Sequence, residues 1–201
     1  MLNKRYPLRL VYIDKDLADQ SAFRSNVAGH PEIRAIFQTK IKFLSSGREA
    51  ASWFQSRNKA ELDAIDLVFF DPESVQSSIT LVDFLKRHGL QRDQIIVLAS
   101  NDDPDALWAE LKQRLGAENV FEKRDALSEG GWEPVNNVIQ SVMSRRSSGN
   151  GETLTFSVVK AEAKVEVLDV QLHALRDDLA SYEDRLDECI EELQSEIRII
   201  S

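Results

Sequence analysis

A few acidic and polar side chains stand directly after apolar runs, where they could take part in chemistry. They are Asp14 and Asp16, Asp71, Ser100 and Lys123. Carboxylates brought together repel one another unless a cation or a lysine balances them. A hard divalent cation such as Mg²⁺ prefers oxygen ligands. A hydroxyl and an ammonium opposite the acids would suit the oxygens of a phosphoryl group.

These side chains can meet only if the apolar runs are strands of one sheet. The predicted strands are residues 8–13, 41–44, 65–70, 94–98 and 119–121. Helical patterns follow them at residues 18–27, 47–54, 79–87, 105–115 and 132–143. This alternation predicts an α/β domain with a five-stranded, parallel, doubly wound sheet. Ligands of such sheets gather outside the carboxyl ends of the strands, so we expect the five residues to share that edge.

The chain divides by composition into a domain and a tail. The α/β pattern occupies residues 1–143, and residues 144–152 are polar, contain glycine and read as a linker. Residues 151–201 contain 13 acidic and 5 basic side chains, which gives them most of the net charge of −9. Nucleic-acid binding needs a basic surface, so this tail is not expected to hold nucleic acid.

Residues 153–201 carry a heptad repeat. With Val158 at position a, the a positions are Val158, Val165, Leu172, Leu179, Leu186, Leu193 and Ile200. The d positions are Ala161, Leu168, Leu175, Tyr182, Cys189 and Glu196. This pattern predicts a long coiled-coil helix that forms a homodimer. A tetramer, a different partner and either helix direction all stay open, as does a single helix that packs back on the domain.

The composition also indicates the cellular compartment of the protein. No apolar stretch approaches the about 18 residues needed to cross a bilayer, so no membrane insertion is expected. Cys189 is the one cysteine of the chain, which excludes an internal disulfide framework. The first residues lack the apolar core and cleavage site of a signal peptide. These features favour the cytoplasm.

Several stretches, taken in order, resemble the receiver (CheY-like) domain of two-component response regulators. They are VYID at 11–14, IDLVFFD at 65–71, IVLAS at 96–100 and LGAENVFEK at 115–123, and SGREA at 46–50 resembles the turn into that family's second helix. The resemblance covers about residues 7–145. It implies a flavodoxin-like fold in a signalling protein that is not itself an enzyme.

The resemblance also implies roles for single residues. Asp71 would accept a phosphoryl group from a sensor histidine kinase, Ser100 would contact the phosphoryl oxygens, and Lys123 would pair with the modified aspartate. The Mg²⁺ ligands would be Asp14, Asp16, Asp71 and the backbone carbonyl of Glu73. Phosphorylation would then act on a downstream protein, whose identity the sequence does not give, through the coiled coil.

The chain departs from the family at three points. Lys15 separates Asp14 from Asp16 where the family has adjacent acids, the Met-Pro turn after Asp71 is absent, and Arg124 replaces the proline after Lys123. A lysine at position 15 could stand in for the metal. These departures indicate an alternative, in which a non-phosphorylated pseudo-receiver acts as a dimeric scaffold or docking protein. Phosphorylation stays the leading prediction, because Asp71, Ser100 and Lys123 are all present. A hydrolase using the same acidic edge is permitted by the fold, but no second active-site loop supports it.

Overall fold

The computed structural model describes most of the N-terminal domain and part of the tail. The described residues are 6–128, 130–149, 161, 164–165, 167–176, 178–179, 181–182, 185–186 and 190. The chain separates into two compact units, Met1–Lys160 and Ala161–Ser201.

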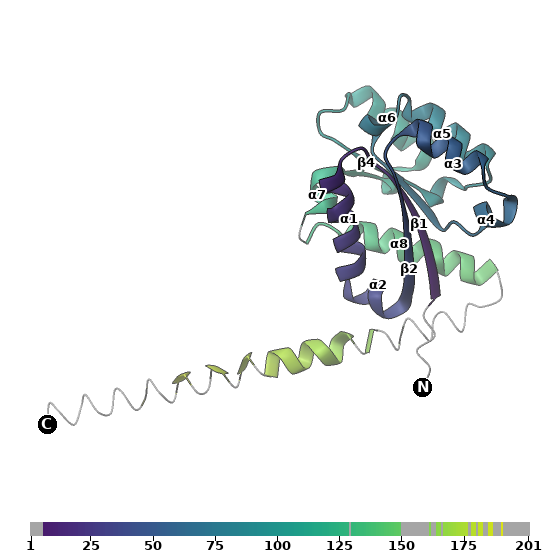
Figure 1. The fold of residues 1–201 in the computed structure, drawn as a ribbon. Coiled ribbons are helices and arrows are strands. Elements are labelled where there is room, and N and C mark those ends of the chain that lie inside the picture. The colour runs from purple at the N-terminus through teal and green to yellow at the C-terminus, as the bar shows by residue number, and fades with distance from the viewer. Residues whose placement is uncertain are drawn as a thin grey trace, which may run out of the picture. The chain divides into compact units, whose positions relative to one another are not determined.

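The first unit is built on a five-stranded parallel sheet (Figure 1). Its strands are β1 (Tyr6–Ile13), β2 (Phe37–Leu44), β3 (Leu67–Phe70), β4 (Ile95–Ala99) and β5 (Val120–Glu122). The strand order is β2-β1-β3-β4-β5, which is that of flavodoxin-like folds. This confirms the predicted α/β class and the parallel sheet.

Helices cover both faces of the sheet, as Figure 1 shows. In chain order they are α1 (Leu17–Gly29), α2 (Pro31–Ile36), α3 (Gly47–Gln55), α4 (Lys59–Asp63), α5 (Ser78–Arg87), α6 (Asp105–Leu115), α7 (Lys123–Leu127) and α8 (Glu133–Gly149). Short 3₁₀ turns occur at Pro72–Ser74, Arg92–Gln94 and Ala117–Asn119.

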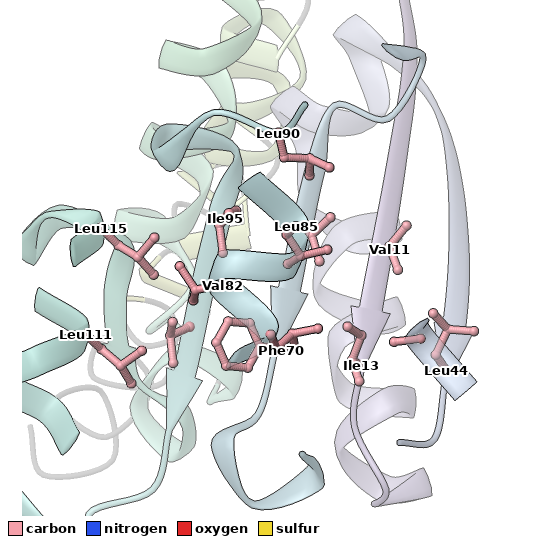
Figure 2. Close-up of a cluster of buried hydrophobic side chains, with 14 of the residues drawn as sticks. Val11, Ile13, Leu44, Phe70, Val82, Leu85, Leu90, Ile95, Leu111 and Leu115 are labelled. Carbon is pink, nitrogen blue, oxygen red and sulfur yellow. The ribbon is translucent and has the colours of Figure 1, made fainter. Parts of the chain in front are cut away.

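Alternation along the strands sends side chains to two separate cores. On one face Val11, Ile13 and Phe70 join a cluster with residues of α3, α5 and α6 (Figure 2). On the other face Tyr12 stacks on Phe23 of α1 with ring centroids 4.3 Å apart. Because consecutive strand residues point to opposite faces, a central strand must be apolar throughout. The uninterrupted apolar runs of β3 and β4 have this cause.

Three short helices were not predicted from the sequence: α2, α4 and α7. Helices of five or six residues are too short to display an apolar period. Their local signals are capping residues: Pro31 opens α2, and Asn58 forms a capping box with Glu61 at the start of α4. Helix α8 continues to Gly149, into the segment predicted as a linker.

The tail is helical wherever the structure describes it, from residue 161 to residue 190, with a continuous run at 167–176. Much of the predicted coiled coil at 153–201 lies outside the described residues, so that prediction stays open. Within the described part of the chain, no helix is both long and apolar enough to cross a bilayer.

Substitution of Leu85 tests the packing of the α5 face. Leu85 is fully buried in the cluster of Figure 2. We expect Leu85→Ala to lower the free energy of unfolding by about 2–5 kcal/mol, because it removes buried methyl groups and leaves a cavity. Urea titration followed by circular dichroism measures it.

Leu17→Ala is the matched control, because Leu17 is 76% exposed at the start of α1. It should change the free energy of unfolding by less than about 0.5 kcal/mol. Equal losses in the two variants would contradict the described packing.

Candidate functional site

The backbone ladder of the sheet places two aspartates side by side. Asp14 follows β1 and Asp71 follows β3, and these strands pair with Ile13 opposite Phe70. The ladder continues one residue further, since the Asp71 amide donates to the carbonyl of Ile13 at 3.0 Å. Both aspartates are 0% exposed.

Lys123, which follows the edge strand β5, supplies the positive charge that balances the two aspartates. It follows β5 as the first residue of α7, and its side chain is 16% exposed. Its Nζ lies 3.5 Å from Asp14 Oδ2, 3.4 Å from Asp71 Oδ2 and 2.8 Å from Asp19 Oδ2. One ammonium therefore contacts three carboxylates, two of them buried.

Asp14 is held by neighbours from its own strand and loop. The Tyr12 hydroxyl donates to Asp14 Oδ2 at 2.5 Å, and the Asp16 amide donates to Asp14 Oδ1 at 2.8 Å. Tyr12 and Asp14 lie two residues apart and so share one side of the extended chain. The Gln20 side chain donates to the Asp14 carbonyl at 2.6 Å.

Asp71 is held by the turn that follows it. The Ser74 hydroxyl donates to Asp71 Oδ2 at 2.8 Å and lies 3.4 Å from Asp14 Oδ1. The Glu73 amide reaches Asp71 Oδ1 at 3.3 Å, which is a longer hydrogen bond than most. All four carboxylate oxygens of the aspartate pair thus accept hydrogen bonds from the protein itself.

These contacts set the protonation states of the site. Burial raises the pKa of the Asp71 carboxyl above its usual range, while the Ser74 hydrogen bond and the Lys123 charge partly offset the rise. Burial alone would lower the pKa of Lys123, but the Asp19 hydrogen bond and the charges of Asp71 and Asp14 outweigh it and raise that pKa. Burial and the adjacent Asp14 raise the pKa of Tyr12, so this hydroxyl stays a donor.

The structure brings together three of the residues singled out in the sequence: Asp14, Asp71 and Lys123. The Asp16 side chain instead caps the start of α1, where it accepts from the Ala18 amide at 2.7 Å. The Ser100 hydroxyl makes a local contact, in which it accepts from the Asp102 amide at 3.3 Å.

Lys15 and Glu73 pair with each other at the rim of the site. Lys15 Nζ lies 3.1 Å from Glu73 Oε2, and the two side chains are 57% and 44% exposed. Their ion pair joins the loop that carries Asp14 to the turn that follows Asp71. The cation that contacts the buried acids is accordingly Lys123, rather than Lys15.

Sequence reasoning missed three residues that complete the site, Tyr12, Ser74 and Asp19. The two-residue spacing of Tyr12 and Asp14 was a usable signal, as was the position of Asp19 in the first turn of α1. Ser74 gave no such signal, because its role depends on the 3₁₀ turn at Pro72–Ser74.

The predicted Mg²⁺ ligands can be judged against these contacts. The oxygens of Asp14 and Asp71 are engaged by internal donors, and Asp16 caps α1. Among the described residues, no group of three or more His, Cys, Asp and Glu side chains is placed to hold a metal ion. The arrangement fits an ammonium group better than Mg²⁺, and the metal site stays a prediction.

No family model and no curated protein matches the chain. The receiver interpretation therefore depends on the quoted stretches, the flavodoxin-like strand order and the geometry of this site.

Changing Lys123 and Lys15 to glutamine should lower the free energy of unfolding by very different amounts. Lys123→Gln removes the cation beside two buried carboxylates and should lower the free energy of unfolding by about 3–5 kcal/mol. Lys15→Gln removes an exposed ion pair and should cost no more than about 1 kcal/mol. Urea unfolding at neutral pH measures both.

Asp71→Asn in the Lys123→Gln background provides the internal check. It removes one of the uncompensated charges, so the double variant should recover part of the lost stability. Equal losses for the two single lysine variants would refute the assignment of Lys123 as the balancing cation.

Proposed function

We propose that this chain is a cytoplasmic signal-transduction protein of the receiver type, which acts through protein interactions as a coiled-coil dimer and not as an enzyme. The flavodoxin-like strand order and the position of Asp71 and Lys123 at the carboxyl edge support this proposal. The quoted sequence stretches around both residues support it independently.

Within this class, the geometry best supports a domain that works without phosphorylation. The observation that carries this proposal is the contact of the Lys123 ammonium with both buried carboxylates, at 3.5 and 3.4 Å. Lys123 already supplies the positive charge that a metal ion would bring. The domain would then serve as a constant docking module, a pseudo-receiver scaffold.

A second candidate is a response regulator phosphorylated on Asp71 by a sensor histidine kinase. One observation favours it: from the described residues, Asp71 Oδ1 accepts only the 3.3 Å bond of the Glu73 amide, so it is the less firmly held oxygen of this carboxylate. That oxygen would attack phosphorus, and the bond from phosphorus to the donor would break. Asp71 is 0% exposed, so the residues that cover it would have to move before a phosphoryl donor could reach it.

Phosphoryl labelling distinguishes the two candidates. The purified full chain is incubated with radiolabelled acetyl phosphate and MgCl₂ beside Asp71→Asn, with an active receiver domain as positive control. We expect no more label on the wild-type chain than on Asp71→Asn, because Lys123 and internal donors occupy the aspartate pair. The measurement is acid-stable and hydroxylamine-sensitive label per chain.

Label that approaches one group per chain in the wild type, and that Asp71→Asn abolishes, would overturn the pseudo-receiver proposal and establish the second candidate. Label that is equal in the wild type and in Asp71→Asn would lie on another residue and would contradict the second candidate alone.

The proposed dimer is supported by the apolar residues of the tail. The large described a and d residues, Val165, Leu168, Leu172, Leu175, Leu179, Tyr182 and Leu186, are between 46% and 67% exposed within the single chain. Spacings of three and four residues place them along one stripe of a helix. A second copy carries the same stripe, so pairing two copies would bury it on both sides.

Charge substitutions on and off this stripe test the dimer. The change Leu172→Lys with Leu179→Lys should convert the dimer to a 22.8 kDa monomer, because lysines at a positions would place charge in the apolar interface in either helix direction. Sedimentation equilibrium at micromolar concentration measures the mass.

Val170→Lys is the matched control, because Val170 is 65% exposed but lies at an f position away from the stripe. This variant should remain a dimer. A monomeric wild-type chain, or dissociation by Val170→Lys alone, would contradict the proposed interface.

A further inference from the structure

A groove of about 740 Å³ runs between α3 and α5, on the face of the sheet covered by the cluster of Figure 2. The two helices are neighbours there, since Phe54 of α3 and Phe84 of α5 contact edge to face with ring centroids 6.2 Å apart. The volume falls within the range of about 300–1,000 Å³ that is typical of small-molecule sites.

One side of the groove is a single face of α5. Ser77, Thr80, Leu81, Phe84 and Arg87 line it, at spacings of three and four residues. Leu81 and Phe84 form an apolar wall between a hydroxyl end at Ser77 and a cationic end at Arg87. By helical rise, Ser77 and Arg87 lie about 15 Å apart.

The opposite side is the beginning of α3, which contributes Gly47, Arg48 and Ala51. Val75 forms part of the floor. A Cβ atom at Gly47 would lie 3.2 Å from Val75 Cβ, which is a tight contact. The small residues Gly47 and Ala51 therefore leave the groove open where α3 approaches the floor.

The charged residues that line the groove are all positive. Most of the net charge of −9 lies in residues 151–201, and the residues that line the groove include two arginines and no acidic residue. Within the described part of the chain, neither Arg48 nor Arg87 has a carboxylate within 4 Å. Arg87 donates to the carbonyl of Asp83 at 3.3 Å.

Hydroxyl donors add to these two cations. Ser46 Oγ accepts from the Glu49 amide at 3.2 Å, and Ser77 Oγ accepts from Thr80, so each oxygen is used as an acceptor. The proton of each hydroxyl is then available to an acceptor in the groove. The groove thus offers positive charge, donor groups and an apolar wall.

We propose that this groove binds a small organic anion. Its apolar or planar body lies against Leu81 and Phe84, and its anionic group, a phosphate or a carboxylate, is held by Arg48 or Arg87. The groove reaches the acidic centre through Ser74, which lines it and also donates to Asp71 at 2.8 Å. The inference does not depend on phosphorylation of Asp71 or on the dimer.

A pair of fluorescent probes tests the anion requirement on the full chain. 8-Anilinonaphthalene-1-sulfonate carries a negative group, and N-phenyl-1-naphthylamine has the same aromatic body without it. We expect the sulfonate to bind at least tenfold more tightly than the neutral probe. The double variant Arg48→Gln with Arg87→Gln should weaken sulfonate binding at least tenfold and leave neutral-probe binding unchanged.

Arg34→Gln is the matched control, because Arg34 is an exposed arginine of α2 that does not line the groove. It should bind the sulfonate like the wild type. Equal affinity of the wild type for the two probes, or wild-type affinity for the sulfonate in the double variant, would overturn the proposal.

Competition then identifies the anionic group. Displacement of the bound sulfonate by adenosine monophosphate, and not by benzoate, assigns a phosphate ligand. The reverse pattern assigns a carboxylate ligand. Failure of both compounds to displace the probe would refute the small-anion class, because both carry a planar body and a negative group.

Discussion

The arrangement at the carboxyl edge depends on one electrostatic constraint: two fully buried carboxylates must be compensated. Asp14 and Asp71 are fixed next to each other by the pairing of β1 with β3, so their charges cannot separate. Lys123 reaches both, and the Tyr12 and Ser74 hydroxyls donate to them. Because the ammonium, the hydroxyls and the carboxylates come from distant parts of the sequence, this network also connects β5 and α7 to the centre of the sheet.

The same constraint shapes what the domain can do. A site whose charge is already balanced by its own lysine gains less from a bound cation than an uncompensated acidic pair does. The exposed Lys15–Glu73 ion pair adds a second link between the two loops over the aspartates. In the proposed pseudo-receiver, a partner that binds near these loops would meet a surface whose shape does not depend on a modified aspartate. The groove between α3 and α5 borders this centre at Ser74, so a ligand bound there would lie next to those loops.

The two units of the chain differ in how far their apolar residues are shielded from water. In the sheet unit, large apolar side chains such as Phe23, Phe54 and Phe69 are fully buried by neighbouring elements. In the tail, the described heptad residues from Val165 to Leu186 are exposed within a single chain. A stripe of that kind is stabilised only by another apolar surface, and a second copy of the same helix supplies one of matching period.

The sequence by itself determined the α/β class, the parallel sheet and the convergence of Asp14, Asp71 and Lys123, because the apolar runs and their alternation with helical patterns are local properties of the chain. It also placed the heptad stripe. Only the tertiary structure decided that Lys123, and not Lys15, contacts the acids, that Asp16 caps α1, and that Ser74 and Tyr12 complete the site. These outcomes depend on which side chains meet across loops and turns, and residue spacing along the chain does not specify such distances.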